Sequence, residues 1–276
     1  MRPELQKKIN QAIRLLKLYN DENNPVEVAY SGGKDSDVIL QLAKEAGINY
    51  RAIYKNTTID PPGTIKHCKD MGVEIMQPKK SFFQLIEQNG LPTRFSRFCC
   101  RYLKEYKVLD KAIIGVRREE SRQRAERYKE PTRCRLYNKN EYVEQIMPIL
   151  EWTTQDVAEF LQDRKIKCAP VYYDECGNFH PERRLGCLGC PLAGRRTRLE
   201  TLKKYPNIVR QYCNRQRKYR KEHPQVKAVT KYFNNEYEQV FRDLFCATQQ
   251  EFVLYQKSLF AMDFKAFLEN YFNIKL

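Results

Sequence analysis

The sequence predicts an α/β fold built on a doubly wound parallel sheet, and two observations carry this prediction. Short β-branched runs alternate with apolar segments of helical spacing between residues 26 and 163. The first run leads into Ser31-Gly32-Gly33-Lys34-Asp35-Ser36, a glycine turn that opens directly into a helix. Ligands of such sheets bind at the carboxyl ends of the strands, so the glycine turn marks the expected site.

The expected elements follow in order along the chain. Residues 5–16 have the apolar spacing of an opening helix, which Pro25 ends. Strands are expected at residues 26–30, 48–55, 73–77, 112–116 and 141–149, with helices at 38–46, 61–70, 82–89, 99–108 and 154–163. We therefore predict an α/β nucleotide-binding domain over 1–169, an irregular cysteine-containing segment over 170–195 and a basic helical extension over 196–276.

Composition excludes several classes of protein. With 276 residues, 42% of them hydrophobic, the chain is of ordinary globular type. It has no apolar run of about 18 residues and no signal-peptide core at its N-terminus, so we expect a cytoplasmic protein without membrane contact. Ten cysteines in a reducing compartment favour metal or redox roles over disulfides. A net charge of +16 indicates a polyanionic partner or substrate.

The glycine turn has the chemistry of a phosphate site. Gly32 and Gly33 allow backbone N–H groups to converge, and the helix start adds partial positive charge. Ser31, Lys34 and Ser36 supply further donors, and Asp35 is a candidate magnesium ligand. The alternative is a plain turn in which Asp35 or Ser36 caps the helix.

A second polar run follows the strand at 112–116. Gly115 ends this strand, and Arg117 and Arg124 follow it with guanidinium groups suited to bidentate binding of phosphate or sulfate. Ser121 lies in the same run and is included in the predicted nucleotide site. The alternative is a solvated charge run on a helix.

Four cysteines form the second strong signal. Cys187 and Cys190 have the C-x-x-C spacing of a metal half-site, and Cys99 and Cys100 are adjacent. Adjacent cysteines are a poor pair for tetrahedral zinc, whereas a cubane cluster tolerates diverging side chains. We therefore expect one centre on these four residues, a 4Fe-4S cluster with zinc as the alternative. Two buried small side chains and an unrelated thiol pair are the other possibility.

The stretch 195–221 interleaves arginines and lysines with tyrosines. This pattern suits phosphate contacts combined with base stacking, and so a DNA or RNA partner. A solvated helix face explains it equally well.

These motifs together resemble the phosphoadenosine phosphosulfate (PAPS) reductase family, within the adenine nucleotide α-hydrolase (HUP-like) superfamily, over residues 24–195. The glycine turn is similar to the pyrophosphate loop of N-type ATP pyrophosphatases. The other matching segments are Cys99-Cys100, 115–124, 148–153 with Asp156-Val157, 171–174 and 186–191. The resemblance implies a five-stranded parallel sheet with adenine nucleotide over the turn, and its cluster-bearing members hold a 4Fe-4S centre on cysteines like these.

Within this family, the turn favours ATP as the substrate. Sulfonucleotide reductases carry their catalytic cysteine in a C-terminal Glu-Cys-Gly-x-His motif, whereas here no cysteine follows Cys246 and the nearest look-alike, residues 175–180, has an extra residue. Reductases also tend to have a degraded glycine turn, whereas this one is intact, as in the ATP sulfurylase small subunit and the DNA phosphorothioation ATP pyrophosphatase.

The resemblance therefore implies an enzyme that uses ATP and Mg²⁺, with Lys34 and Asp35 as catalytic residues. It would adenylate an acceptor for sulfur transfer, with nucleic acid among the candidate acceptors and a sulfur-donor protein as a further partner. One alternative is an APS or PAPS reductase that produces sulfite. The other is a non-catalytic nucleotide sensor that binds nucleic acid.

Overall fold

A computed structural model of the protein describes residues 1–138, 141–226, 232–246, 248–257 and 263–276. The chain divides into two compact units. Unit 1 contains Met1–Asn56, Asp60–Pro78 and Lys104–Leu185, and unit 2 contains Thr57–Ile59, Lys79–Leu103 and Gly186–Leu276. Each unit thus joins segments that are distant in sequence. The predicted boundaries after residues 169 and 195 stay a prediction.

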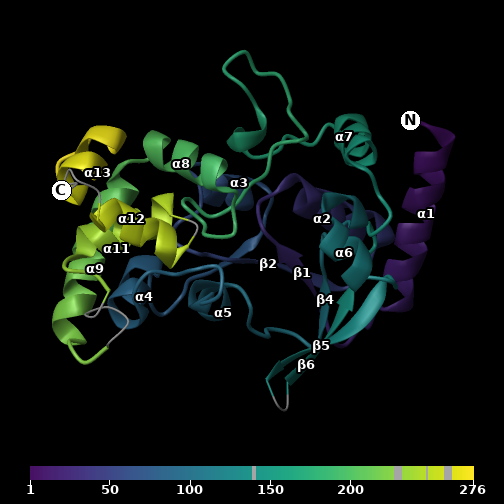
Figure 1. The fold of residues 1–276 in the computed structure, drawn as a ribbon. Coiled ribbons are helices and arrows are strands. Elements are labelled where there is room, and N and C mark those ends of the chain that lie inside the picture. The colour runs from purple at the N-terminus through teal and green to yellow at the C-terminus, as the bar shows by residue number, and fades with distance from the viewer. Residues whose placement is uncertain (139–140, 227–231, 247, 258–262) are drawn as a thin grey trace. The chain divides into compact units, whose positions relative to one another are not determined.

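Unit 1 is built on a six-stranded sheet of order β3-β2-β1-β4-β6-β5 (Figure 1). The strands are β1 (Val26–Tyr30), β2 (Tyr50–Lys55), β3 (Glu74–Met76), β4 (Lys111–Ile113), β5 (Thr132–Asn138) and β6 (Glu141–Ile146). Five of them run parallel, and β5 pairs antiparallel with β6 at the edge. The predicted α/β fold is therefore confirmed, and β5 is a strand that the sequence did not reveal.

The helices of unit 1 are α1 (Pro3–Leu18), α2 (Lys34–Ala46), α3 (Thr64–Asp70), α6 (Arg122–Arg127) and α7 (Thr154–Asp163). Helix α2 packs against both α1 and α7. Together with Val26 and Val28 of β1, these helices enclose the buried core of the unit. Helix α3 begins later than predicted because Gly63 has a φ of +87°, a left-handed conformation that a regular helix excludes.

Unit 2 is helical where it is described. Its helices are α4 (Phe82–Asn89), α5 (Phe98–Leu103), α8 (Arg195–Lys204), α9 (Asn207–Glu222), α11 (Glu236–Phe245), α12 (Gln249–Lys257) and α13 (Phe264–Phe272). Helix α4 begins with a capping box at Ser81 and packs on α9 through Leu85 and Ile86. The helices after residue 195 thus share a core with α4 and α5, and the predicted extension over 196–276 as a separate region stays a prediction. No helix in the described ranges has the length and apolar character needed to span a bilayer.

Candidate functional site

The glycine turn between β1 and α2 depends most on the first of its two glycines. Gly32 has a φ of +77°, and a Cβ atom there would lie 2.8 Å from Thr64 Cγ2 of helix α3. Gly33 is the N-cap of α2, and its conformation is extended. No side chain caps this helix, so the alternative in which Asp35 or Ser36 is the cap is wrong. The backbone of the turn at Gly32 therefore packs closely against α3.

Substitution of Gly32 tests this packing. We expect Gly32→Ala to lower the free energy of unfolding by about 2–4 kcal/mol, since a left-handed residue and a clash with Thr64 both add cost. Gly72→Ala is the matched control, because Gly72 has a φ of +73° but open space around its Cα. Urea unfolding of both variants separates strain from crowding. Equal losses would contradict the role of the Thr64 contact.

Hydrogen bonds fix the shape of the turn. Ser36 Oγ donates to the Gly33 carbonyl at 2.6 Å, and Ser31 Oγ lies 3.3 Å from Ser36 Oγ. The Lys34 N–H donates to Tyr172 Oη at 3.2 Å, and the Leu185 N–H donates to the same oxygen at 3.4 Å. Tyr172 therefore ties the start of α2 to the segment that ends unit 1.

A cavity of about 350 Å³ opens on the turn. Seven of the predicted site residues line it: Ser31, Gly33, Lys34, Asp35, Ser36, Gly115 and Arg124. Ala29, Val116, Glu120, Tyr172, Arg184 and Leu185 complete the wall. Gly32 and Ser121 do not line the cavity. Ser121 instead caps α6 by accepting the Arg124 N–H at 3.2 Å. The structure thus brings the turn and the strand-end run of β4 to one place.

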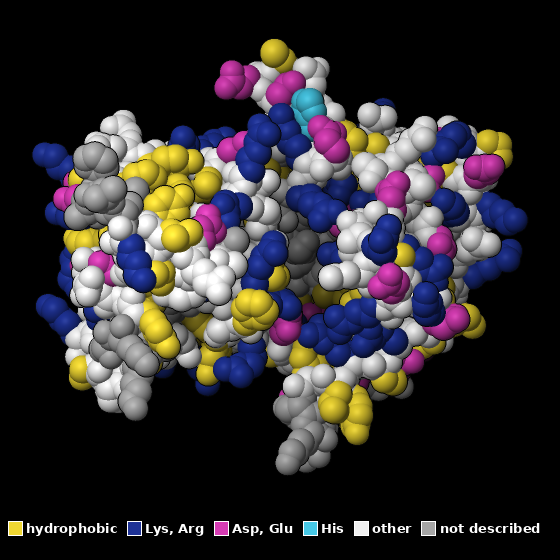
Figure 2. Space-filling view, in the orientation of Figure 1, with side chains coloured by type: hydrophobic (Ala, Val, Ile, Leu, Met, Phe, Trp, Pro, Cys, Tyr) yellow, Lys and Arg dark blue, Asp and Glu magenta, His cyan; other side chains and the backbone are white. Residues whose placement is uncertain are grey.

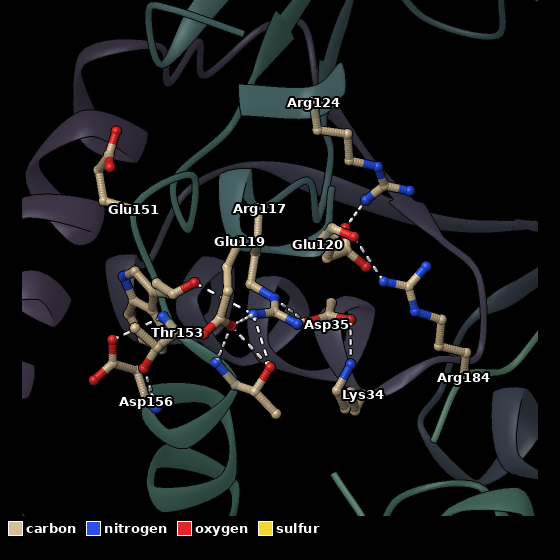
Figure 3. Close-up of polar contacts among 12 residues, drawn as sticks. Lys34, Asp35, Arg117, Glu119, Glu120, Arg124, Glu151, Thr153, Asp156 and Arg184 are labelled. Atoms are coloured by element: carbon tan, nitrogen blue, oxygen red, sulfur yellow. Dashed lines mark hydrogen bonds and ion pairs between the residues drawn. The ribbon is translucent and has the colours of Figure 1, made fainter. Parts of the chain in front are cut away.

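Lys34, Asp35 and Arg117 form a chain of ion pairs at the cavity (Figure 3). Lys34 Nζ lies 2.8 Å from Asp35 Oδ2, and Arg117 Nε lies 2.7 Å from Asp35 Oδ1. Arg117 is only 2% exposed, and its Nη1 also lies 2.8 Å from Glu119 Oε2. Arg117 therefore lies behind Asp35 and positions it, while its predicted contact with phosphate stays a prediction.

Two other arginines meet at Glu120 (Figure 3). Arg124 forms an ion pair with the Glu120 carboxylate, and Arg184 Nη2 donates to the Glu120 carbonyl at 2.9 Å. Burial and the neighbouring Arg184 guanidinium lower the pKa of Arg124. With Lys34, the wall carries three cations against the two carboxylates of Asp35 and Glu120, and this excess of positive charge favours anions. Arg184 is a site residue that sequence reasoning missed.

A buried polar cluster of Tyr30, Asp37 and His67 lies next to the glycine turn. Asp37 is fully buried, and its Oδ1 accepts a hydrogen bond from Tyr30 Oη and contacts His67 Nε2 at 2.8 Å. Burial and the Asp37 carboxylate raise the pKa of Tyr30. These contacts join α2 to α3, the helix that packs against Gly32. Sequence reasoning missed this cluster, because no spacing links Tyr30, Asp37 and His67.

A second cavity, of about 270 Å³, lies on the face of the sheet that carries Glu27 and Ala29. Tyrosines 54, 106, 128 and 137 line it, together with Lys55, Lys104, Lys107 and Arg135. Glu27 and Gln145 are buried in its wall: Glu27 Oε1 pairs with Lys55 Nζ at 3.0 Å, whereas Gln145 Oε1 has no hydrogen-bond partner among the described residues. We call this the sheet-face cavity. It shares Ala29, Ser31 and Val116 with the cavity on the turn.

The four predicted metal ligands all belong to unit 2. Cys99 and Cys100 lie in α5, and Cys187 and Cys190 flank Gly189, which has a φ of +67°. A hydrogen bond with Cys100 raises the pKa of the Cys99 thiol, and burial and the nearby Cys187 add to this. In the ranges that the structure describes, no group of three or more His, Cys, Asp or Glu residues is arranged to hold a metal ion. The four-cysteine centre stays a prediction.

The basic stretch 195–221 is largely engaged within unit 2. Arg198 is buried, and its Nη2 lies 2.6 Å from Asp243 Oδ2. Arg215 and Lys218 both pair with Glu87, and Arg217 Nε lies 2.6 Å from Glu236 Oε1. Many of its cations therefore join helices. On the visible face, dark-blue Lys and Arg side chains instead gather over β4–β6 of unit 1 (Figure 2).

Comparison with known proteins places the chain in a family. Two uncharacterised proteins of Methanocaldococcus jannaschii are 27% and 26% identical over 76% and 74% of this chain, which is 53% and 44% of their own lengths. Sulfate adenylyltransferase subunit 2 of Rhizobium tropici is 26% identical over 55% of this chain and 61% of its own length. The chain therefore spans about half the length of the curated relatives it matches first.

Among solved structures, the phosphoadenylyl-sulfate (PAPS) reductase of Candida auris is similar with a TM-score of 0.45 and 13% identity, over 65% of this chain and 97% of that one. Residues 25–193 match the phosphoadenosine phosphosulfate reductase domain. This match covers the glycine turn, the strand-end run of β4 and both cysteine pairs. The protein belongs to the phosphoadenosine phosphosulfate reductase domain family.

Proposed function

We propose that this protein is an ATP-using enzyme that adenylates an acceptor, with release of pyrophosphate, as a step in sulfur transfer. The observation that carries the proposal is the cavity on the intact glycine turn, where the start of α2, Lys34, Arg124 and Arg184 converge. Helix starts and guanidinium groups are the common binders of phosphate in proteins. Membership of the family supports an adenine nucleotide as the ligand.

The triphosphate would replace carboxylates as the partner of the cations in the cavity. Lys34 Nζ now pairs with Asp35, and the Arg124 guanidinium pairs with Glu120. A bound phosphate chain gives both groups a partner of higher charge, and charge-assisted hydrogen bonds of this kind are strong. Ser31 and Ser36 add hydroxyl donors at the same wall.

The nucleoside would occupy the sheet-face cavity. This cavity shares Ala29, Ser31 and Val116 with the cavity on the turn, so it can receive the part of a nucleotide that continues from the phosphates. Its tyrosine rings offer stacking surfaces for a base. The buried Gln145 Oε1 lacks a hydrogen-bond partner among the described residues and suits the amino group of adenine.

Magnesium would bind at Asp35. A carboxylate oxygen is the donor type that Mg²⁺ prefers, and Asp35 faces the cavity. Lys34 and Arg117 each hold one Asp35 oxygen, so the ion would compete most directly with one of these two cations. Lys34 is the one that phosphate would recruit. When bound, the ion would neutralise charge on the phosphate chain.

The chemical step is a displacement at the α-phosphorus of ATP. An oxygen of the acceptor forms a bond to this phosphorus, the bond from phosphorus to the bridging α–β oxygen breaks, and pyrophosphate leaves with the electron pair. The chain's own residues hold the reactants in line and stabilise charge on the transferring and leaving oxygens. Lys34, Arg124 and the backbone N–H groups at the start of α2 would do this work, since they line the same cavity.

A 4Fe-4S cluster would bind in unit 2. Four thiols of the right type belong to this unit; Cys99 is hydrogen-bonded to Cys100, and Cys187 is near enough to raise the pKa of Cys99. Since the described residues show no assembled set of ligands, loading requires side chains to rearrange. When bound, a cluster supplies either electron transfer or a rigid staple between α5 and the turn at residues 187–190.

The proposal is tested with the purified full chain. Calorimetry should detect Mg²⁺-dependent binding of α,β-methylene-ATP. We then expect pyrophosphate to form from ATP when sulfate, total RNA or genomic DNA is supplied as a trial acceptor. Adenosine phosphosulfate and its 3′-phosphorylated form are assayed in parallel with a thiol reductant. Sulfite from either of them, with no binding of the ATP analogue, would replace the proposal with a sulfonucleotide reductase. Binding without any turnover would favour a nucleotide sensor.

A further inference from the structure

We propose that an arginine-lined cavity in unit 2 binds a backbone phosphate of a single-stranded nucleic acid, with a neighbouring base stacked on Phe95. This site lies wholly within unit 2, and its binding does not depend on ATP turnover in unit 1. The cavity has a volume of about 320 Å³, and its wall includes Arg94, Phe95, Pro191, Arg195, Arg242 and Asp243. Two of its segments come shortly before Cys99-Cys100 and directly after Cys190, and the third is residues 242–246 at the end of α11.

The charge of the cavity is strongly positive after its internal pairs are accounted for. Arg198 also lines it, but this side chain pairs with Asp243 at 2.6 Å and donates from Nε to the Gly189 carbonyl at 2.9 Å. That pair is neutral and structural. Arg94, Arg195 and Arg242 remain, with no other carboxylate in the wall.

These three arginines have donors to spare. Among the described residues, the one hydrogen bond of the Arg94 side chain runs from Nε to the Pro191 carbonyl, at 3.1 Å. Arg195 Nη2 lies 3.7 Å from Glu251 Oε2, and Glu251 does not line the cavity. Arg242 Nε is buried and has no hydrogen-bond partner among the described residues. A buried N–H without an acceptor is costly, and a phosphate oxygen is the acceptor that guanidinium groups bind best.

Phe95 offers a stacking surface beside these arginines. Its side chain is fully exposed, although it lies in an ordered turn. Thr93 Oγ1 accepts the Ser96 N–H at 2.9 Å, and the Thr93 N–H donates to the Ser96 carbonyl at 3.2 Å. The ring is thus presented at the edge of a basic cavity by a constrained loop. Exposed aromatic rings beside cations are the stacking platforms of proteins that bind single strands, because a duplex hides its base faces.

The test measures binding of a fluorescent single-stranded oligouridylate to the full chain by anisotropy across a range of salt concentrations. We expect affinity to fall steeply as salt rises, since each neutralised phosphate contributes about −0.7 to the logarithmic slope. Phe95→Ala should weaken binding by about 5- to 150-fold, the usual range for loss of one stacked base. Arg195→Gln should reduce the salt slope by about 0.7.

Matched controls come from the same unit. Leu254→Ala removes another exposed apolar side chain, in α12, and Arg196→Gln removes the next arginine, whose side chain is 91% exposed and does not line the cavity. If each variant binds no more weakly than its control, the cavity is not the site. Equal affinity for a duplex of the same length, or full displacement by uridine monophosphate at a low concentration, would overturn a single strand as the ligand. Lys34→Ala should bind the oligonucleotide normally, which separates this test from the proposed function.

Discussion

Lys34→Ala is expected to reduce pyrophosphate release from ATP by at least about 100-fold, the usual cost of removing a group that stabilises charge in the transition state. The side chain of Lys34 is 4% exposed, and its Nζ lies at the wall of the cavity on the turn. Nucleotide binding should weaken as well, because in the proposed mechanism Lys34 would contact the phosphates in both the ground state and the transition state. Single-turnover release of pyrophosphate and calorimetry with the ATP analogue measure the two effects separately.

Lys44→Ala is the control for this variant. Lys44 lies near the end of the same helix, is exposed and is remote from the turn in the sequence. Asp35 keeps its ion pair with Arg117 when Lys34 is removed, so we expect the turn to stay folded, which thermal unfolding of both variants checks. Turnover of Lys34→Ala within twofold of Lys44→Ala would contradict the assignment of the turn as the phosphate site.

The glycine turn could be predicted from sequence because its signal is local. A strand, two glycines and an apolar-periodic helix follow one another within about twenty residues, and the structure keeps that order. Strand β5 could not be predicted, since Arg133 and Arg135 interrupt its apolar pattern. Charged side chains of this kind are tolerated on an edge strand, where they also discourage pairing with other chains.

The arginines show where local signals fail. Arg117 and Arg184 each belong to a pair of adjacent arginines in the sequence. Arg117 is nevertheless buried behind Asp35, whereas Arg184 lines the cavity. The difference arises from the path of the chain after Tyr172. The Leu185 N–H donates to Tyr172 Oη, and this contact brings Arg184 back to the glycine turn. The basic stretch 195–221 is similar, because Glu87 and Asp243, which neutralise parts of it, are distant in sequence.

Cys187→Ser is expected to remove the iron that anaerobically prepared wild-type protein should contain, about four iron and four sulfide per chain if the centre is a cubane. Serine keeps the size of the side chain but not the soft sulfur ligand, so the visible absorption of the cluster should disappear with the metal. Cys176→Ser is the control, because Cys176 is exposed in unit 1 and belongs to neither cysteine pair. Iron and sulfide analysis of both variants gives the result directly.

Metal content identifies the centre, and pyrophosphate release shows whether adenylation needs it. Stoichiometric zinc without iron would contradict the cluster but support a four-cysteine site, and equal metal content in Cys187→Ser and Cys176→Ser would contradict the site itself. The glycine turn lies in unit 1 and the cysteine pairs lie in unit 2, each with its own core. If Cys187→Ser loses iron but still releases pyrophosphate at the wild-type rate, adenylation does not need the cluster. The cluster would then act after adenylation, in the delivery of sulfur, or as a staple for α5 and the turn at residues 187–190.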